Sequence, residues 1–110
     1  MQKQYRLKRR ASFNYVYKKG EKAASRHLLV LYAKSREGLK IGISVTKKVG
    51  NAVTRNRVKR LIREALNPLI GHINANYMYV IAVRPSIVEL SFSEVLVEVE
   101  KAFSRAGKLQ

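Results

Sequence analysis

The sequence contains no cysteine, no aspartate and no tryptophan, and only two of its 110 residues are proline. Without cysteine the chain cannot form a disulfide, use a catalytic thiol or bind a metal through thiolates. The longest apolar runs, 28–33 and 77–83, are too short to cross a bilayer. The first six residues lack the apolar core of a signal peptide. We therefore expect a soluble cytoplasmic protein.

Groups of residues that are typical of enzyme active sites are also scarce. A two-metal nuclease centre needs clustered carboxylates from several elements, and all seven acidic residues here are scattered glutamates. His27 and His72 have no nucleophile or carboxylate near them in the sequence. No glycine-rich phosphate loop is present. The sequence thus predicts no small-molecule substrate and no catalytic residue on this chain.

Positive charge is the property that the chain has in excess. Lysine and arginine number 23 against seven glutamates, which gives a formal charge of +16. Residues 1–63 hold 19 of the 23 basic residues, together with strand-like apolar runs. Such an excess opposes folding through self-repulsion, so we interpret it as serving an anionic partner. Charge alone leaves both a membrane surface and a nucleic acid open; we favour nucleic acid and expect no membrane partner.

The hydrophobic pattern indicates a mixed α and β domain. We expect a first helix that Ser12 caps and that Gly20 ends in a left-handed conformation. Two strands, 27–34 and 40–46, then follow and are expected to form an antiparallel hairpin. Asn67-Pro68 ends a second helix, which runs over 51–66.

The remaining elements complete the α+β arrangement. Residues 77–84 are apolar almost throughout, as in a strand with both faces covered. Ser91 and Glu94 have the spacing of a capping box, which predicts the start of a final helix. Read from the residues alone, the order is α-β-β-α-β-α.

The helix at 51–66 and the turn before it carry the clearest binding signal. Its apolar stripe faces one way, and no acidic residue interrupts 38–63. A merely solvated helix face usually alternates in charge sign, so this pattern favours RNA binding. The candidate RNA-binding residues are Lys47, Lys48, Asn51, Arg55, Asn56, Arg57, Lys59, Arg60 and Arg63.

Aromatic residues near the N-terminal cations give a second candidate site. Phe13, Tyr17 and Tyr32, with Lys8 and Arg9, could stack unpaired bases beside phosphates. The alternative is that these rings only pack the first helix onto the sheet, and spacing alone favours packing.

The stretch 44–64, with Arg55-Asn56-Arg57 followed by a basic amphipathic helix, closely resembles the signature of the protein subunit of bacterial ribonuclease P. The pattern at 6–20 and the run at 81–85 also match, so the resemblance covers most of the chain. It implies one domain over residues 1–110, an α+β two-layer α-β-β-β-α-β-α sandwich with a left-handed βαβ crossover. One further strand is then expected within 22–34.

The resemblance also implies a function. In that family the RNA subunit removes the 5′ leader from precursor tRNA with bound Mg²⁺, and the protein assists. The nine residues around the basic helix would face the ribonuclease P RNA. Phe13, Tyr17 and Tyr32, with Lys8 and Arg9, would line a cleft for the single-stranded leader, which reverses the packing preference. The protein alone would bind no cofactor, because the RNA would hold most of the Mg²⁺ of the complex. The rival readings are a ribosomal-type rRNA-binding protein and a protein-only nuclease.

Overall fold

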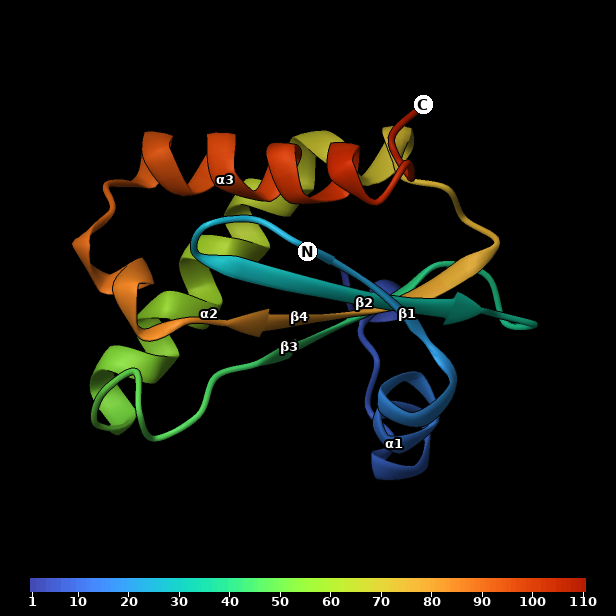
Figure 1. Cartoon of the computed structure of the whole chain (residues 1–110), viewed down its shortest axis with the longest axis horizontal. Helices are drawn as coiled ribbons and strands as arrows, with labels where there is room; N and C mark the ends of the chain where they lie inside the picture. Colours follow the sequence, from blue (N-terminus) through green and yellow to red (C-terminus); the bar gives the residue numbers. More distant parts are fainter.

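The computed structural model describes residues 1–110, and Figure 1 shows how its helices and strands are arranged. In chain order the elements are η1 (Lys3–Tyr5), α1 (Arg10–Lys19), β1 (Glu21–Ala24), β2 (Leu28–Lys34), β3 (Lys40–Ser44), α2 (Ala52–Leu66), η2 (Asn67–His72), β4 (Tyr77–Val83), η3 (Pro85–Glu89) and α3 (Phe92–Arg105). No helix is long and apolar enough to span a membrane.

The four strands form one sheet in the order β1-β2-β4-β3. β4 is antiparallel to β2 and parallel to β3. The expected antiparallel hairpin of 27–34 with 40–46 is therefore wrong, because β4 lies between the two strands. Tyr79, Val80 and Ile81 of β4 are fully buried. A strand covered on both faces is best placed in the interior of a sheet, where it has a neighbour on each edge.

The strand that the residue pattern alone did not show is β1. It pairs antiparallel with β2, from Glu21 opposite Tyr32 to Ala24 opposite Leu29. Its addition gives the order α-β-β-β-α-β-α, so the α+β fold implied by the resemblance is confirmed. α2 connects the parallel strands β3 and β4. The left hand of this crossover stays a prediction from the resemblance.

Alternating side chains of the strands build a core on each face of the sheet. Leu28, Val30 and Ile81 belong to the larger core, which α2 and α3 cover. Leu31 and Val80 belong to a smaller core on the opposite face, together with Val16 of α1. Figure 1 shows this arrangement, with α2 and α3 on one side of the sheet and α1 on the other. α1 is therefore the only α-helix against the second face.

Both expected ends of α1 differ from the structure. The helix begins at Arg10, after Arg9, and no side chain caps it, so Ser12 lies inside the first turn. Gly20 has an extended backbone, with φ −76° and ψ 156°, rather than a left-handed one. Glycine is needed there for space, because a Cβ atom would collide with the carbonyl oxygens of Val16 and Tyr32.

The starts of the other two α-helices agree with the sequence. The Asn51 side chain accepts a hydrogen bond of 2.9 Å from the Thr54 amide at the start of α2. Ser91 and Glu94 form the expected capping box at the start of α3. These contacts satisfy amides that the helices leave without an internal partner.

Candidate nucleic-acid interface

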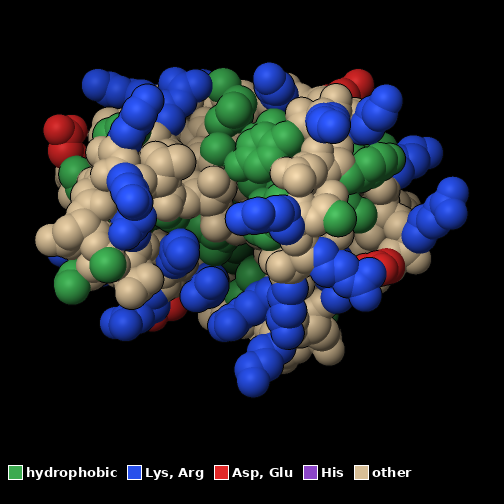
Figure 2. All heavy atoms as spheres, turned by 90° about the horizontal axis from the view of Figure 1, so that it is seen from below, with side chains coloured by type: hydrophobic (Ala, Val, Ile, Leu, Met, Phe, Trp, Pro, Cys, Tyr) green, Lys and Arg blue, Asp and Glu red, His purple; other side chains and the backbone are tan.

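A groove with basic walls lies where α1, α2, β3 and the segment before α1 meet. Four of its ten lining residues are lysine or arginine, and none is acidic. Seen from the α1 side, the surface is hollowed there and bordered by lysine and arginine side chains (Figure 2). We call this cavity the basic groove, and its lining residues are Met1, Arg6, Leu7, Lys8, Phe13, Ile41, Gly42, Ile43, Lys59 and Arg63.

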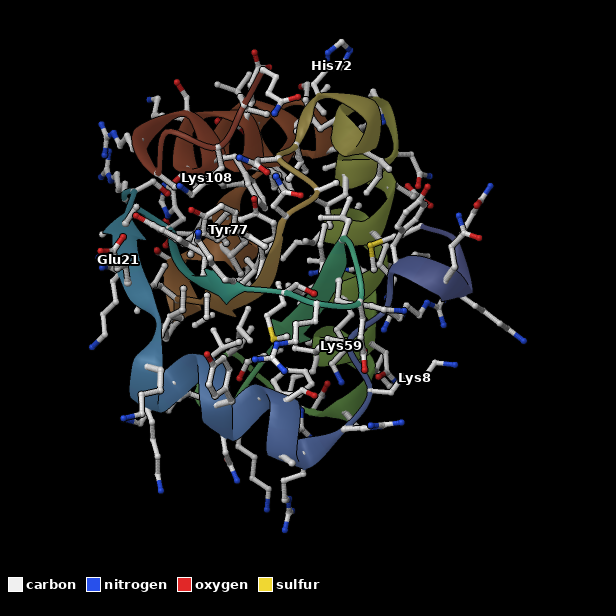
Figure 3. The ribbon with its side chains drawn as sticks, turned by 90° about the vertical axis from the view of Figure 1, so that its right-hand side faces the viewer. Lys8, Glu21, Lys59, His72, Tyr77 and Lys108 are labelled. Atoms are coloured by element: carbon white, nitrogen blue, oxygen red, sulfur yellow. The ribbon has the colours of Figure 1, made fainter.

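Backbone pairing positions the N-terminal wall of the basic groove. The Leu7 amide donates a hydrogen bond of 3.0 Å to the carbonyl of Ile41, and Arg6 forms a parallel bridge with the same residue. The segment before α1 therefore runs along the free edge of β3. This brings Lys8 to the same groove as Lys59, which is far from it in the sequence (Figure 3).

The aromatic part of the groove is Phe13. Its ring lies directly over Gly42, where any Cβ atom would overlap the ring. One side of the ring packs against the smaller core with Leu7 and Val80, and the residue as a whole is half-buried. Phe13 thus packs α1 onto the sheet and also presents part of its ring to the groove. The two alternatives posed by the sequence are compatible.

Two guanidinium groups make the groove a favourable place for an anion. The Nε atoms of Arg6 and Arg63 are both buried, and neither has a hydrogen-bond partner. Burial, and then the positive charge of Arg6, lower the pKa of Arg63 below its ordinary value. An anion between the two side chains would offset this repulsion and accept the unused hydrogen bonds.

The structure distributes the predicted residues of α2 over different sides of the helix. Lys59 and Arg63 line the basic groove. Arg57 instead lines a small apolar pocket formed with η3 and α3. Asn56 and Arg60 are exposed, whereas Arg55 is half-buried. The helix therefore presents cations to the groove and also to its surroundings.

The turn before α2 adds to the outer side of this surface. Lys47 and Lys48 are exposed, and hydrogen bonds from Val49 to Thr46 and from Gly50 to Lys47 close the turn. The side-chain oxygen of Asn51 caps α2, and its amide nitrogen keeps both N–H donors for a ligand.

The five residues predicted for the leader cleft do not all meet. Lys8 and Phe13 line the basic groove, and Arg9 lines a neighbouring pocket. Tyr17 does not line the groove, and 42% of its surface is exposed. α1 packs on the sheet through Phe13 and Val16, and Tyr17 is not part of that core.

The structure does not bring Tyr32 to the basic groove. Its ring lies on the α3 face of the sheet, 6.0 Å from the ring of Tyr77, and the Lys108 ammonium lies 4.8 Å from its centroid. Burial, and then the charge of Glu21, raise the pKa of Tyr32. Successive strand residues face opposite sides, so Leu31 faces α1 and Tyr32 cannot.

The residue patterns did not single out Arg6, Ile41 or Gly42 as groove residues. Gly42, between two isoleucines of a strand, was the available signal, because an isolated strand glycine often marks a close approach. For Arg6 the resemblance at 6–20 was the only sign.

A separate buried network accounts for His27. Its backbone amide and the Ser25 hydroxyl donate to Glu98 Oε2 at 2.7 and 2.6 Å. Its Nδ1 lies 2.6 Å from the Ser86 hydroxyl oxygen. Burial opposes the charge on Glu98, but these two hydrogen bonds leave its pKa below the ordinary value. The network joins α3 to the sheet, away from the basic groove.

Cations that line a groove beside a partly exposed aromatic ring are the chemistry with which proteins bind nucleic acids, single strands in particular. The groove therefore has the composition that is typical of a nucleic-acid-binding surface.

Comparison with known proteins gives the family. The family model described as ribonuclease P matches residues 1–107. The ribonuclease P protein component of Shouchella clausii is 42% identical over 112 residues, covering 99% of this chain and 91% of the relative. That of Symbiobacterium thermophilum is 38% identical, covering 100% of this chain and 97% of the relative. This chain belongs to the family of ribonuclease P protein components.

Solved structures agree with the sequence relatives. A mutant ribonuclease P protein of Staphylococcus aureus has a TM-score of 0.89 at 33% identity, covering 96% of this chain and 90% of that one. The Thermotoga maritima protein has a TM-score of 0.83 at 28% identity, covering 91% and 96%. As a component of ribonuclease P, the chain takes part in tRNA processing with the ribonuclease P RNA.

Proposed function

We propose that this chain is the noncatalytic subunit of ribonuclease P and that its basic groove binds the single-stranded 5′ leader of precursor tRNA. The observation that carries the proposal is the ring of Phe13, which is half-buried over Gly42 among four cations with no acidic residue beside it. A single strand offers bases that stack on such a ring and phosphates that the cations neutralise.

The outer sides of α2 suit a different RNA. Asn56 and Arg60 are exposed there, as are Lys47 and Lys48 in the preceding turn. Exposed cations on a helix and its preceding turn match the phosphates and shape of a folded RNA. We therefore assign this surface to the ribonuclease P RNA and the groove to the leader, so that the protein lies between the two.

Magnesium is left to the RNA in this proposal. The polar groups that line the groove are lysine and arginine, which donate hydrogen bonds and repel a divalent cation. Their contribution is to neutralise two polyanions that would otherwise repel each other. A lower repulsion favours close approach of the leader to the catalytic RNA at low magnesium concentration.

A partition of affinities tests this assignment. The protein–RNA complex is titrated with precursor tRNA that carries a leader and with mature tRNA, which lacks one. Lys59→Gln, in the groove, is expected to weaken binding of the precursor and leave mature tRNA unaffected. Arg57→Gln, on the other side of α2, is expected to weaken assembly with the ribonuclease P RNA instead. Equal effects of the two variants in both assays would contradict the division.

The control arms separate the alternative functions. The S. aureus structure is that of a ribonuclease P protein mutant with defective mRNA degradation activity, so an unstructured mRNA is incubated with the present protein alone. Degradation by the protein alone would show a nuclease and contradict the noncatalytic assignment. Tight binding to rRNA without stimulation of precursor cleavage would favour the ribosomal alternative.

A further inference from the structure

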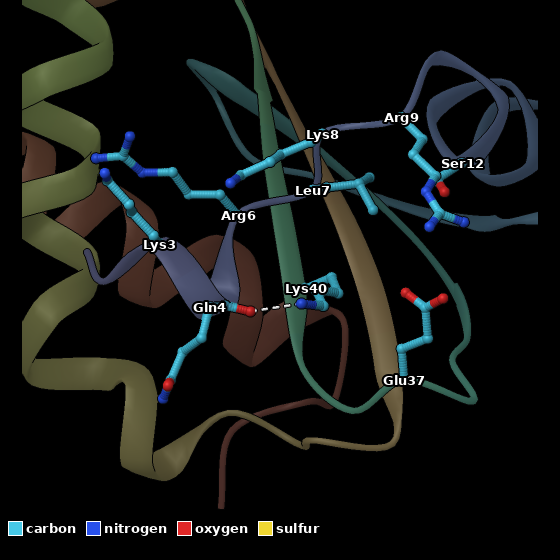
Figure 4. Close-up of a pocket in the computed structure, with 9 residues that line it drawn as sticks. All are labelled: Lys3, Gln4, Arg6, Leu7, Lys8, Arg9, Ser12, Glu37 and Lys40. Atoms are coloured by element: carbon cyan, nitrogen blue, oxygen red, sulfur yellow. Dashed lines mark hydrogen bonds between the residues drawn. The ribbon is translucent and has the colours of Figure 1, made fainter.

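A second basic pocket lies beside the groove, at the start of α1. Five of its nine lining residues are cations, and Glu37 is its only acidic residue. Figure 4 shows Glu37 and Arg9 directed toward each other across this pocket, with Lys40 between the N-terminal segment and β3. We call it the Glu37 pocket, and its lining residues are Lys3, Gln4, Arg6, Leu7, Lys8, Arg9, Ser12, Glu37 and Lys40.

The walls of the Glu37 pocket are held in place by hydrogen bonds. Lys40 Nζ donates to the Gln4 carbonyl at 2.6 Å, which ties the N-terminal segment to β3. The Ser35 hydroxyl donates to the Gly38 carbonyl at 2.7 Å and accepts from the Glu37 amide at 3.2 Å. The turn that carries Glu37 is thereby fixed, with Gly38 at φ +83°, a conformation that favours glycine. The pocket exists before any ligand arrives.

Its composition differs from that of the groove in a way that indicates a nucleotide. Cations such as Arg9 suit a phosphate, and Lys40 keeps two unused N–H donors. A carboxylate repels phosphate, but it accepts hydrogen bonds from the hydroxyls of a ribose. The Ser12 hydroxyl adds a neutral group to the same wall. Cations that donate hydrogen bonds to a phosphate, next to a single carboxylate, match a ribonucleotide better than a bare anion.

The pocket also shares a wall with the basic groove. Arg6, Leu7 and Lys8 line both cavities. An RNA strand that lies in the groove can therefore cross the N-terminal segment and place its next nucleotide in the pocket.

We propose that the Glu37 pocket is a ribonucleotide subsite. Its cations, Arg9 in particular, bind a phosphate, and the Glu37 carboxylate accepts a hydrogen bond from the ribose 2′-hydroxyl. The 2′-hydroxyl is the group that distinguishes RNA from DNA. The subsite thus selects RNA at this position. Only the identity of the strand as the leader rests on the function proposed above.

The experiment measures binding of the full chain to single-stranded RNA and DNA oligonucleotides of the same sequence at several salt concentrations. Glu37→Ala is expected to reduce the preference for RNA over DNA by about tenfold, the effect of losing a hydrogen bond to a charged group. Glu37→Gln removes the negative charge but keeps an acceptor, so both strands bind more tightly and most of the preference stays. Glu100→Ala, at an exposed position on α3, is the matched control.

The phosphate contact is tested with Arg9→Gln. Loss of one phosphate contact reduces the slope of log affinity against log salt by about 0.7 for a single strand. Lys22→Gln removes the same charge on β1, at the opposite edge of the sheet, and is expected to leave the slope unchanged. Because both side chains are exposed, neither substitution removes core packing.

An unchanged preference for RNA in Glu37→Ala, or equal salt slopes for Arg9→Gln and Lys22→Gln, would overturn the subsite. RNA oligonucleotides with a 5′-hydroxyl or a 5′-triphosphate identify the phosphate. Tighter wild-type binding of the triphosphate indicates a terminal phosphate, and equal binding indicates an internal one. Failure of the function proposed above would appear separately, as absent stimulation of precursor cleavage while the preference for RNA still depends on Glu37.

Discussion

Replacing Phe13 by leucine separates stacking from packing at the basic groove. Leucine fills most of the space above Gly42, so the smaller core stays filled. The free energy of unfolding is therefore expected to fall by less than about 1.5 kcal/mol. The aromatic face presented to the groove disappears. Stacking of one base on such a ring contributes about 1–3 kcal/mol, so the affinity for a single-stranded leader should fall about 5- to 140-fold.

The assay is fluorescence anisotropy with a leader oligonucleotide, accompanied by thermal unfolding of the same samples. Phe13→Ala serves as the comparison, because it removes packing as well as stacking. Truncation of a fully buried phenylalanine to alanine lowers the free energy of unfolding by about 3–5 kcal/mol. Phe13 is half-buried, so we expect roughly half of that loss. A leucine variant that binds the leader as tightly as the wild type would refute the stacking role and leave Phe13 as a packing residue.

Three further changes test the groove and the buried network. Gly42→Ala should place a methyl group against the Phe13 ring, so that it lowers the stability by about 1–3 kcal/mol and also weakens leader binding. An unchanged melting temperature and unchanged anisotropy would contradict the close approach. Arg63→Gln relieves the repulsion with Arg6, so thermal stability should stay the same or rise. The affinity for RNA, and the slope of log affinity against log salt, should both fall. A fall in thermal stability would contradict the repulsion. Glu98 has a lowered pKa, so its stabilisation is present above its unfolded pKa of about 4.5 and is lost as pH falls through the folded value. Urea unfolding from pH 6 to 3 should therefore show a smaller loss of stability in Glu98→Gln than in the wild type.

The helices of the larger core could be predicted because their signals are local. Asn51 and the Ser91–Glu94 pair cap α2 and α3 from within one turn, and the apolar positions repeat with the helical period. The pairing of β3 could not be predicted in the same way. Sheet order depends on which strand is buried on both faces, and a neighbouring pair in sequence is only the default.

Tyr32 shows why the sequence could not tell which side chains of β2 face α1. β2 is apolar almost throughout, because both of its faces are covered, so its sequence has no polar alternation to reveal which residues face α1. A shift of one position moves a side chain to the other face. Phe13 and Lys8 line the same groove in the structure, and their role in leader binding stays a prediction, whereas the face of Tyr32 required the tertiary structure.

The proposed role in ribonuclease P is tested by cleavage of a precursor tRNA at low magnesium concentration with a bacterial ribonuclease P RNA, with this protein, or with both. We expect cleavage at the mature 5′ end only when both are present, because on our proposal the protein neutralises the two RNAs and holds the leader in the basic groove. Cleavage by the protein alone would contradict the noncatalytic role. No stimulation by the protein, despite binding to the RNA, would contradict the role in ribonuclease P itself.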